Sequence, residues 1–310
     1  MSRASPLVLV SVLNWNTAAL TIECLRALRT SDYVPARVVV IDNASTDDSV
    51  ARLLAFDDTL CVIRAERNLG FAEGHALALP LASAIGATAI WLVNSDALVE
   101  PQALSTLVSA WLRHGDAIYG GLPLEGRTTG HARISFPEKY LRADARPSAF
   151  ERDRPLWFDS HWLTREPFAV AAVVGSSMLV PLSIIERAGW MDARWFLYCE
   201  EIDYCLSLRT QGIASYIVPG SRCWHGGGGS HRDSKPLADC IHYYRTRNDI
   251  VLSARHAGRW TAAMVATKKL LRAGFTWATD RQRGRLMFRA VRDAMLGRLG
   301  KTLAPEDWRG

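Results

Sequence analysis

The stretches LVLVSVLNWN (residues 7–16) and RVVVIDNASTDDS (residues 37–49) decide the fold of this protein. Each is a short run of branched apolar residues that ends at asparagine or aspartate, and residues 17–29 between them have the spacing of a helix. Apolar runs without polar alternation indicate strands that are buried on both faces. Strand, helix and strand in this order predict a parallel sheet covered by helices, the α/β class.

The same alternation continues along the chain. A strand at 60–64, a helix through Ala84, a strand at 88–93 and a helix from Pro101 to Arg113 follow in order. Residues 114–165 are rich in Arg, Gly and Pro and predict a loop-rich insert with one strand at 132–136. The later predicted elements are helices at about 182–188, 236–256, 259–274 and 281–299, a helix that opens at Glu200, and a strand at 214–219.

The composition is that of an ordinary globular protein. Of the 310 residues, 49% are hydrophobic and 22% are charged, which excludes a disordered chain, a collagen and a disulfide-stapled miniprotein. The net charge of +6 is unevenly placed, because residues 255–310 hold thirteen basic and four acidic side chains. A basic region of this kind predicts contact with an anionic surface, either membrane lipid, polyphosphate or nucleic acid.

Neither the cysteines nor the long uncharged stretches change this classification. The six cysteines include no C-x-x-C pair, so we expect reduced thiols. Residues 76–95 and 167–185 approach the roughly 20 residues of a membrane span, but proline, glycine and serine divide each into shorter soluble elements. Residues 6–13, PLVLVSVL, precede no small-residue cleavage site and predict a buried strand instead of a signal peptide.

Polar residues follow each of the first four predicted strands. In an open α/β sheet, ligands bind beyond the carboxyl ends of the strands, so these residues are candidates for a binding site. One such group alone would be ordinary turn chemistry, whereas four groups on one rim predict a site. The groups are Asn14 and Asn16; Asp42, Asn43 and Ser45; Asn68 and Gly70; and Asn94, Ser95 and Asp96.

Asp96 and His225 are candidate metal ligands. A carboxylate at the end of a buried strand can hold a divalent cation, and Asn94 points to the same side of the extended chain. An imidazole just after the strand at 214–219 can complete the coordination. A lone histidine is more often structural, but the four glycines that follow His225 favour a site.

Glu200, Glu201 and Asp203 are candidate acid–base groups. They open the helix within GWMDARWFLYCEEIDYCLSLRTQG, residues 189–212. The helix dipole alone favours carboxylates at this position. The aromatic run at 195–198 would also desolvate them in part, which gives a carboxylate a pKa suited to a general base.

Two other nucleotide-binding motifs are excluded. No G-x-G-x-x-G follows the first strand, so a dinucleotide oxidoreductase is not expected. GRLGKT at 297–302 has only two residues between its glycines and no strand before it, so it is not a phosphate loop. No nucleic-acid-binding module accompanies the basic region, and we expect no nucleic acid partner.

Six motifs in order resemble the family 2 inverting glycosyltransferases with the GT-A fold, most closely their bacterial rhamnosyltransferase-like branch. The motifs are VSVLNWN, VVVIDNASTDDS, NLGFAEG, LVNSDALVEP, GWMDARWFLYCEEIDYCLSLRTQG and WHGGGGS. The resemblance covers about residues 7–255. It implies a Rossmann-like GT-A domain with a mostly parallel sheet and helices on both faces, plus a C-terminal helical extension. Residues 1–233 would form the catalytic domain, with a donor half at 1–113 and an acceptor half at 114–233, and residues 234–310 would form the basic helical region.

The resemblance also implies roles for single residues. Glu201 would be the base, and Glu200 and Asp203 stay as alternatives because the family usually has aspartate at position 201. Asp96 and His225 would ligate Mg²⁺ or Mn²⁺ on the donor diphosphate. Residues expected to line the pocket for the donor's base and ribose are Asn16, Asp42, Asn43, Asn68 and Gly70. The rest of the predicted nucleotide-sugar site is Asn14, Ser45, Asn94, Ser95 and Asp96, and the expected acceptor side is Gly175, Ser176, Trp190 and Asp192.

Two further positions depart from the family pattern. Asn94-Ser95-Asp96 stands where the family often has Asn-Pro-Asp or Asp-x-Asp, which leaves Asp96 as the one firm carboxylate ligand. His75 stands where asparagine is frequent, and it could equally be structural or contact the sugar.

The reaction implied is a single displacement that inverts the anomeric carbon. We expect dTDP-L-rhamnose as the donor and a glycan or lipid-linked acceptor of cell-surface polysaccharide synthesis. UDP-galactofuranose or a UDP-hexose is the alternative donor. A relative that binds a nucleotide sugar or a glycan without transferring is the competing class of protein.

The basic region mixes aromatic and aliphatic residues with Lys and Arg between 259 and 300, as an interfacial amphipathic helix does. It predicts a cytoplasmic protein that docks peripherally on the inner face of the cell membrane, where a polyprenyl-diphosphate-linked acceptor would be found. The alternative is a helical subdomain that packs on the catalytic core or on a second subunit of a homodimer.

Overall fold

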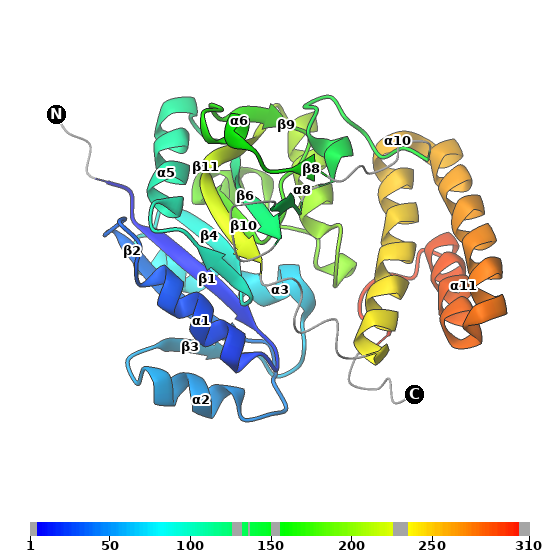
Figure 1. Ribbon diagram of the computed structural model, residues 1–310, viewed down its shortest axis with the longest axis horizontal. Coiled ribbons are helices and arrows are strands. Elements are labelled where there is room, and N and C mark those ends of the chain that lie inside the picture. Colours follow the sequence, from blue (N-terminus) through cyan, green and yellow to red (C-terminus); the bar gives the residue numbers. More distant parts are fainter. Residues whose placement is uncertain (1–4, 126–131, 136, 150–155, 226–234, 304–310) are drawn as a thin grey trace.

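The computed structural model describes residues 5–125, 132–135, 137–149, 156–225 and 235–303. These residues form an α/β protein with one eleven-stranded sheet flanked by helices, and long helices at the C-terminal end (Figure 1). The α/β class and the C-terminal helical extension that the sequence predicts are confirmed.

The first half of the sheet is parallel. Its strands in spatial order are β3 (Cys61–Arg64), β2 (Ala36–Asp42), β1 (Val8–Asn14) and β4 (Ala89–Asn94). Val8 pairs with Ala36 on one side and with Ala89 on the other, so the carboxyl ends of β1, β2 and β4 meet at one edge. The sequence located each of these strands to within one residue.

The second half of the sheet is mixed. It contains β10 (Ser177–Pro181), β6 (Ile118–Glu125), β11 (Ser215–His225) and β5 (Ala97–Val99), in this order after β4. β10 is antiparallel to both of its neighbours, and β5 is antiparallel to β11. The predicted mostly parallel sheet therefore holds for the first four strands and for the pair of β6 and β11, which is also parallel. β10 is an antiparallel strand between these two parts, because no helix directly precedes it to carry the chain back in the same direction.

Part of the region predicted as a loop-rich insert is sheet. β6 lies there, and so do the short strands β7 (Arg133–Ile134) and β8 (Leu156–Trp157), while β9 (Phe168–Val170) lies just beyond it. Glycine and proline weaken the strand signal of β6. Gly120 and Gly121 are nevertheless required by packing, since a Cβ at either would lie 2.6 Å from Val173 or Ser177.

Helices cover both faces of the sheet. One core layer contains α1 (Ala18–Leu28), α2 (Ser49–Phe56) and α5 (Ala103–His114). The other contains α3 (Gly70–Ala76), α4 (Leu79–Ala84), α7 (Leu182–Ala188) and α8 (Glu200–Thr210). The helix predicted through Ala84 is in fact two helices, α3 and α4, and Pro80 lies in the first turn of α4.

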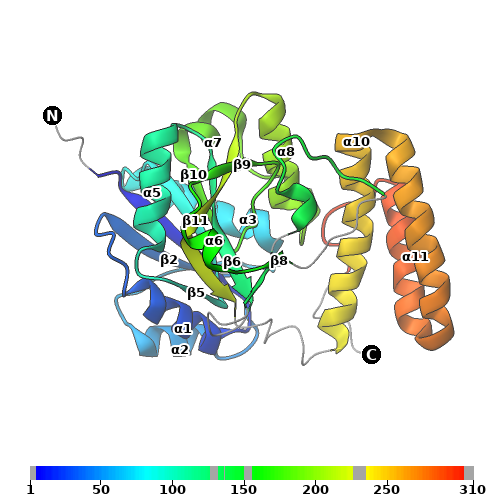
Figure 2. The same cartoon turned by 45° about the horizontal axis from the view of Figure 1, so that its top comes forward.

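Two long helices follow the sheet at the C-terminal side, α10 (Lys235–Thr279) and α11 (Arg281–Met295) (Figures 1 and 2). α10 is broken at Gly258, where φ is 86°, so it consists of two helices, as the sequence predicts, but the second continues to Thr279, beyond its predicted end at 274. Its first half packs against the part of the molecule that contains the sheet, because Leu252 belongs to the same hydrophobic cluster as the sheet residues. α11 ends before its predicted terminus, and the following Gly297 has a φ of 64°.

Within the described ranges, no helix has both the length and the apolar character needed to cross a bilayer. The two uncharged stretches fold as short elements, one as α4 and β4 and the other as β9, β10 and α7. All six cysteines are free thiols, as expected.

Candidate active site

Buried polar side chains join the carboxyl ends of β1 and β2. Asn14 Nδ2 donates to Asp42 Oδ1 (2.9 Å) and to the Oγ of Ser45 (3.1 Å), and Asn14 Oδ1 accepts from the hydroxyl of Thr21 (2.8 Å). Asn14 and Asp42 are almost completely buried. Their side chains therefore hold the rim of the sheet in shape.

Asn43 connects this rim to the loop after β3. Its Nδ2 donates to the carbonyl oxygen of Gly70 (3.0 Å) and to Asn68 Oδ1 (3.3 Å), and its Oδ1 accepts from the N–H of Leu69 (2.9 Å). Asn68 Oδ1 also accepts from the N–H of Gly70 (3.0 Å). Three of the predicted site residues are thus brought together by hydrogen bonds within the protein.

Asn16 is exposed at the rim and has a strained backbone. Its φ is 54°, and Ala44 at the end of the neighbouring strand has a φ of 61°. Asn16 Oδ1 accepts from the N–H of Thr46 (2.8 Å), and its N–H donates to Ser45 Oγ (2.9 Å). Left-handed backbone is costly for residues other than glycine and clusters at functional sites.

The loop before α8 packs against this rim and is strained as well. Positive φ values occur at Phe196, Tyr198 and Cys199. The carbonyl oxygen of Phe196 accepts from the N–H of Phe71 (2.9 Å). A Cβ at Gly70, whose φ is +76°, would lie 2.1 Å from that oxygen, so only glycine fits there.

Asp96 lies half-buried in the turn between β4 and β5. The N–H of Asn94 donates to the carbonyl oxygen of Ser176 (3.3 Å), which connects this turn to the loop before β10. The hydroxyls of Ser95 and Thr17 lie 3.3 Å apart. The turn is therefore connected both to the start of α1 and to the predicted acceptor side.

The charges of Asp96 and of the two glutamates that open α8 all act on the side chain of Tyr198. Burial is the main cause of the raised pKa of Tyr198, and the charges of Glu200, Glu201 and Asp96 raise this pKa further. The carboxylates at the end of β4 and at the start of α8 thus lie near enough to Tyr198 for their charges to act on it.

His225 is the last residue of β11. Its backbone pairs with Ala97, the residue after Asp96. The side chain of His225 and the glycines at 226–229 lie outside the described part of the structure. Within that part, no group of three or more His, Cys, Asp or Glu side chains is arranged to hold a metal ion.

Glu201 has the electrostatics of a general base. It lies half-buried in the first turn of α8. Burial raises its pKa to about 7, against the opposing effects of nearby backbone N–H groups, including that of Gly175, and of the positive charge of Arg245. A carboxylate that titrates near neutral pH can take a proton and is still charged in a substantial fraction of molecules.

Glu200 lies in a different environment although it is adjacent in sequence. It is buried, and its Oε2 has no hydrogen-bond partner among the residues that the structure describes. Burial, and then the charge of Glu201, raise its pKa well above the ordinary value. Glu200 is therefore less suited than Glu201 to accept a proton from a substrate.

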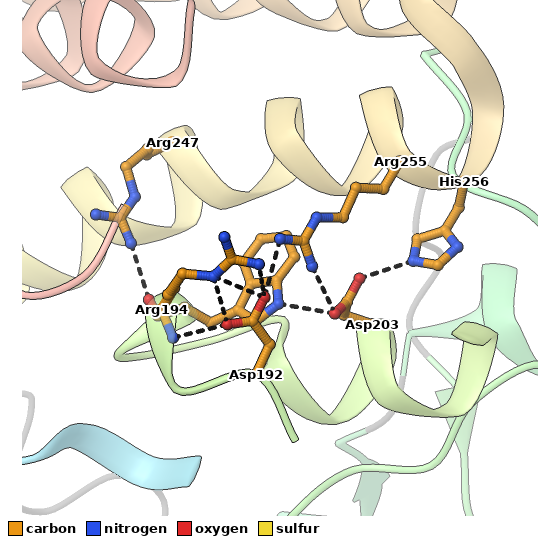
Figure 3. A network of polar contacts seen from close by, with 7 residues as sticks. Asp192, Arg194, Asp203, Arg247, Arg255 and His256 are labelled. Carbon is orange, nitrogen blue, oxygen red and sulfur yellow. Dashed lines mark hydrogen bonds and ion pairs between the residues drawn. The ribbon is translucent and has the colours of Figure 1, made fainter. Parts of the chain in front are cut away.

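Asp203 is engaged by several donors (Figure 3). Its Oδ2 accepts from Trp195 Nε1 (2.9 Å) and from Arg255 Nη1 (2.9 Å), and its Oδ1 lies 2.8 Å from the Nε2 of His256. Arg255 and His256 belong to α10. Asp203 thus connects α8 to the C-terminal helices.

The predicted acceptor-side residues separate into two pairs. Gly175 and Ser176 lie at the rim; a Cβ at Gly175 would be 2.4 Å from the ring of Phe71. Asp192 pairs with Arg194 and with Arg255, both at 2.8–2.9 Å. Burial tends to raise the pKa of Asp192, but these hydrogen bonds lower it to about 2.

The indole of Trp190 is also fixed, since its Nε1 donates to the carbonyl oxygen of Ala72 (2.8 Å). Trp190 and Asp192 therefore support the loop before α8, whereas Gly175 and Ser176 border the site itself.

Two residues of α10 that sequence reasoning missed hold the same loop. Asn248 Nδ2 donates to the carbonyl oxygens of Leu197 (2.9 Å) and Tyr198 (2.8 Å). The fully buried Arg247 donates from Nη2 to the carbonyl oxygen of Trp195 (2.8 Å). Arg247 lies three or four residues from apolar residues on the same side of its helix. A charged residue on the apolar side of a predicted helix indicates a buried charge with specific partners, and this pattern could have identified Arg247 from the sequence.

His75 has a structural position. It is completely buried, its Nδ1 lies 2.9 Å from Ser11 Oγ, and burial lowers its pKa to about 3. The ring is therefore neutral and packs in the core against Phe71.

Comparison with known proteins identifies similar glycosyltransferases. Residues 8–161 match the model of glycosyl transferase family 2. An N-acetylglucosaminyl-diphospho-decaprenol L-rhamnosyltransferase of Mycobacterium tuberculosis is 24% identical over 261 residues, which cover 77% of this chain and 82% of that protein. Rhamnosyltransferase WbbL of Escherichia coli is 38% identical over 61 residues, which cover 20% of this chain and 22% of that protein.

Among solved structures, the mannosyltransferase PcManGT from Pyrobaculum calidifontis, in complex with GDP-Man and Mn²⁺, has a TM-score of 0.59 and is 15% identical. The match covers 95% of this chain and 88% of that chain. The similarity shows a common GT-A fold.

Proposed function

Because the chain belongs to glycosyltransferase family 2, we propose that it transfers a sugar from a nucleotide donor to an acceptor hydroxyl, with inversion at the anomeric carbon. The observation that carries this proposal is the position of Glu201. This half-buried carboxylate has a pKa of about 7 and is reached by the N–H of Gly175, while the carbonyl oxygen of the next residue, Ser176, accepts from the N–H of Asn94 beside the turn that holds Asp96.

The donor would lie on the rim formed by the first four strands. Asn14 and Asp42 hold this rim through their mutual hydrogen bond, and Asn43 holds it through its bond to the carbonyl oxygen of Gly70. Asn16 and Ser45 stand at its open side. The rim belongs to the proposed donor half, residues 1–113. The proposed acceptor half, residues 114–233, supplies Gly175, Ser176 and Glu201.

A divalent cation fits this site if the donor completes its coordination. Asp96 offers a carboxylate at the rim, and Asn94 and the backbone of His225 lie next to it. Asp96, with His225, would hold Mg²⁺ or Mn²⁺, and that ion would take up negative charge that develops on the leaving diphosphate.

The transfer step needs one proton acceptor. Glu201 removes the proton from the acceptor hydroxyl, and that oxygen attacks the anomeric carbon from the face opposite the nucleotide. The bond from the anomeric carbon to the diphosphate oxygen breaks, and the nucleoside diphosphate leaves with the electron pair. The N–H of Gly175 and the positive charge of Arg245 favour the charged form of Glu201 before the step.

The relatives support a rhamnosyl donor and a lipid-linked acceptor. Both are rhamnosyltransferases, and one is named for an N-acetylglucosaminyl-diphospho-decaprenol substrate. We therefore propose dTDP-L-rhamnose as the donor and a sugar linked through diphosphate to a lipid as the acceptor.

A thermal-shift panel tests the donor. We expect dTDP and dTDP-L-rhamnose with Mn²⁺ to raise the melting temperature, because a ligand that binds only the folded state stabilises it. Asp96→Ala should lose the metal-dependent part of the shift, and Asp58→Ala, in an exposed turn at the opposite edge of the sheet, should keep it. A preference for UDP compounds would favour UDP-galactofuranose or a UDP-hexose, and no response to any nucleotide would contradict the proposal.

A transfer assay then tests catalysis. The substrates would be dTDP-L-rhamnose and an N-acetylglucosaminyl-diphospho-lipid, with the product's anomeric configuration read by NMR. Nucleotide binding with no turnover on any tested acceptor would favour a non-catalytic binding protein.

A further inference from the structure

The outer half of α10, residues 259–279, carries its large apolar side chains on the outside of the molecule. Its buried side consists of small residues, Ala262, Val265, Ala266 and Ala273. The exposed large apolar residues are Trp260, Met264, Leu270, Leu271, Phe275 and Trp277. A helix that only needed to pack on its neighbours would have the reverse arrangement.

Four of these residues form one continuous row. Trp260, Met264, Leu271 and Phe275 are spaced at i, i+4, i+11 and i+15, which places them on one side of the helix. Trp260, Leu271 and Phe275 are 75%, 62% and 79% exposed. Thr267 in the same row donates its hydroxyl to a carbonyl of its own helix (3.0 Å), so the row stays apolar. We call Trp260, Met264, Leu271 and Phe275 the outer apolar face.

Positive charge borders the outer apolar face. Residues 250–279 contain no Asp or Glu. Arg259 and Arg272 are exposed and form no ion pair with any described residue. Arg259 lies over the ring of Trp260 (5.7 Å), and Arg285 of α11 lies over that of Trp277 (5.5 Å).

This helix is also placed where a large surface could reach it. Figures 1 and 2 both show the outer half of α10 at the end of the molecule farthest from the sheet. Twenty-one helical residues span about 30 Å. The row of four side chains covers most of that length.

We propose that the outer apolar face docks on a membrane that contains anionic phospholipid, with the helix parallel to the membrane plane. Trp260 and Phe275 would enter the boundary between headgroups and acyl chains, and Arg259 and Arg272 would contact lipid phosphates. A second copy of this chain is a poorer occupant, because two such faces would bring arginines together with no acidic residue between them.

Vesicle co-sedimentation of the full chain tests the proposal. The vesicles would be pure phosphatidylcholine, or phosphatidylcholine with phosphatidylglycerol, at low and high salt. We expect binding to the anionic vesicles that weakens as salt is raised. Trp260→Asp and Phe275→Asp should each reduce this binding about tenfold or more. Leu112→Asp is the matched control, since Leu112 is an exposed apolar residue on α5.

Absence of vesicle binding would overturn the proposal, as would equal binding of the two face variants and the wild-type chain. A concentration-dependent dimer in light scattering that Phe275→Asp abolishes, without vesicle binding, would assign the face to a second copy. Melting temperatures of the variants separate these outcomes from misfolding. The assay needs no turnover, so its failure is distinct from failure of the proposed transfer reaction.

Discussion

Glu200 and Glu201 show how one residue step on a helix changes the chemistry of a carboxylate. Both are in the first turn of α8, where the helix dipole favours negative charge. Glu200 points into the protein and has an oxygen without a partner, whereas Glu201 is half-buried and is reached by the N–H of Gly175. Burial therefore distinguishes the proposed base, Glu201, from its neighbour, and a run of acidic residues in a sequence does not reveal burial.

Glu201→Gln should lower kcat by about 10²–10⁴-fold, because the amide cannot accept the proton. Donor binding in the thermal-shift panel should be retained. Glu200→Gln is the matched control and should change kcat by no more than about threefold, since it replaces a group that holds its proton firmly. The reverse pattern would assign the base to Glu200, and full activity of both variants would leave Asp203 to be tested.

The rate of the wild-type enzyme should depend on pH with an acidic limb near the pKa of Glu201. Below about pH 6, kcat should fall about tenfold per pH unit as Glu201 becomes protonated. Asp192, with a pKa of about 2, does not titrate in this range. A pH profile of kcat with saturating donor measures the limb, and a flat profile from pH 5 to 8 would contradict the role of Glu201.

The same raised pKa affects stability. Folding raises the pKa of Glu201, so the stability that comes with its protonated form is present at low pH and is lost as pH rises through about 7. Glu201→Gln should thus raise the free energy of unfolding at pH 8, by on the order of 1–3 kcal/mol, and leave it nearly unchanged at pH 4. Urea unfolding at the two pH values measures the difference.

At the scale of elements, the loop at 195–199 is held from two sides. The first turn of α3 contacts it through the N–H of Phe71 and through Gly70. α10 contacts it through Arg247 and Asn248. This double support maintains the strained backbone just before Glu201.

Gly70→Ala should destabilise the protein by about 3 kcal/mol or more, because the new Cβ would overlap the carbonyl oxygen of Phe196. Gly86→Ala separates backbone strain from this overlap. Gly86 has a similar φ of +70°, but no atom lies within 4 Å of the place that its new Cβ would take, so its cost should be about 1 kcal/mol. Equal urea midpoints for the two variants would contradict the close contact at Gly70.

Asn248→Asp should lower kcat more than it lowers donor affinity. Aspartate has the same shape but cannot donate to the carbonyls of Leu197 and Tyr198, at a cost of about 1–3 kcal/mol. Ser253→Ala on the same helix is the control, because that hydroxyl bonds only within α10. The measurements are kcat and the rise in melting temperature that dTDP causes, for both variants. An unchanged kcat in Asn248→Asp would show that the loop needs no support from α10.

At the scale of the whole molecule, the C-terminal helices are continuous with the catalytic part. Leu252 of α10 lies in the hydrophobic core that contains the sheet. Phe196 of the loop at 195–199 lies in the hydrophobic core of the C-terminal helices. Asp203 joins α8 to Arg255 and His256 across the same boundary. The division at residue 234 stays a prediction from the sequence, and hydrophobic clusters of the structure contain residues from both sides of it.

Unfolding should accordingly be a single cooperative transition. Calorimetric and van't Hoff enthalpies should agree in a scanning experiment on the full chain. A shortened chain of residues 1–234 should lack activity, because it loses Asn248, Arg255 and His256. Two resolved transitions, or an active shortened chain, would show that the helices form an independent domain.

The sequence by itself determined the α/β class, the positions of the first four strands, the three helices of the C-terminal region with the break at Gly258, and the polar residues at the strand ends. These features depend on local patterns: runs of branched apolar residues, breakers such as Gly258, and polar residues where a strand stops. Tertiary structure alone decided the mixed half of the sheet, the support of the site loop by Asn248, and the difference between Glu200 and Glu201. Those depend on contacts between residues far apart in the chain and on burial, and the free energy of a buried polar group is set by partners that no local pattern contains.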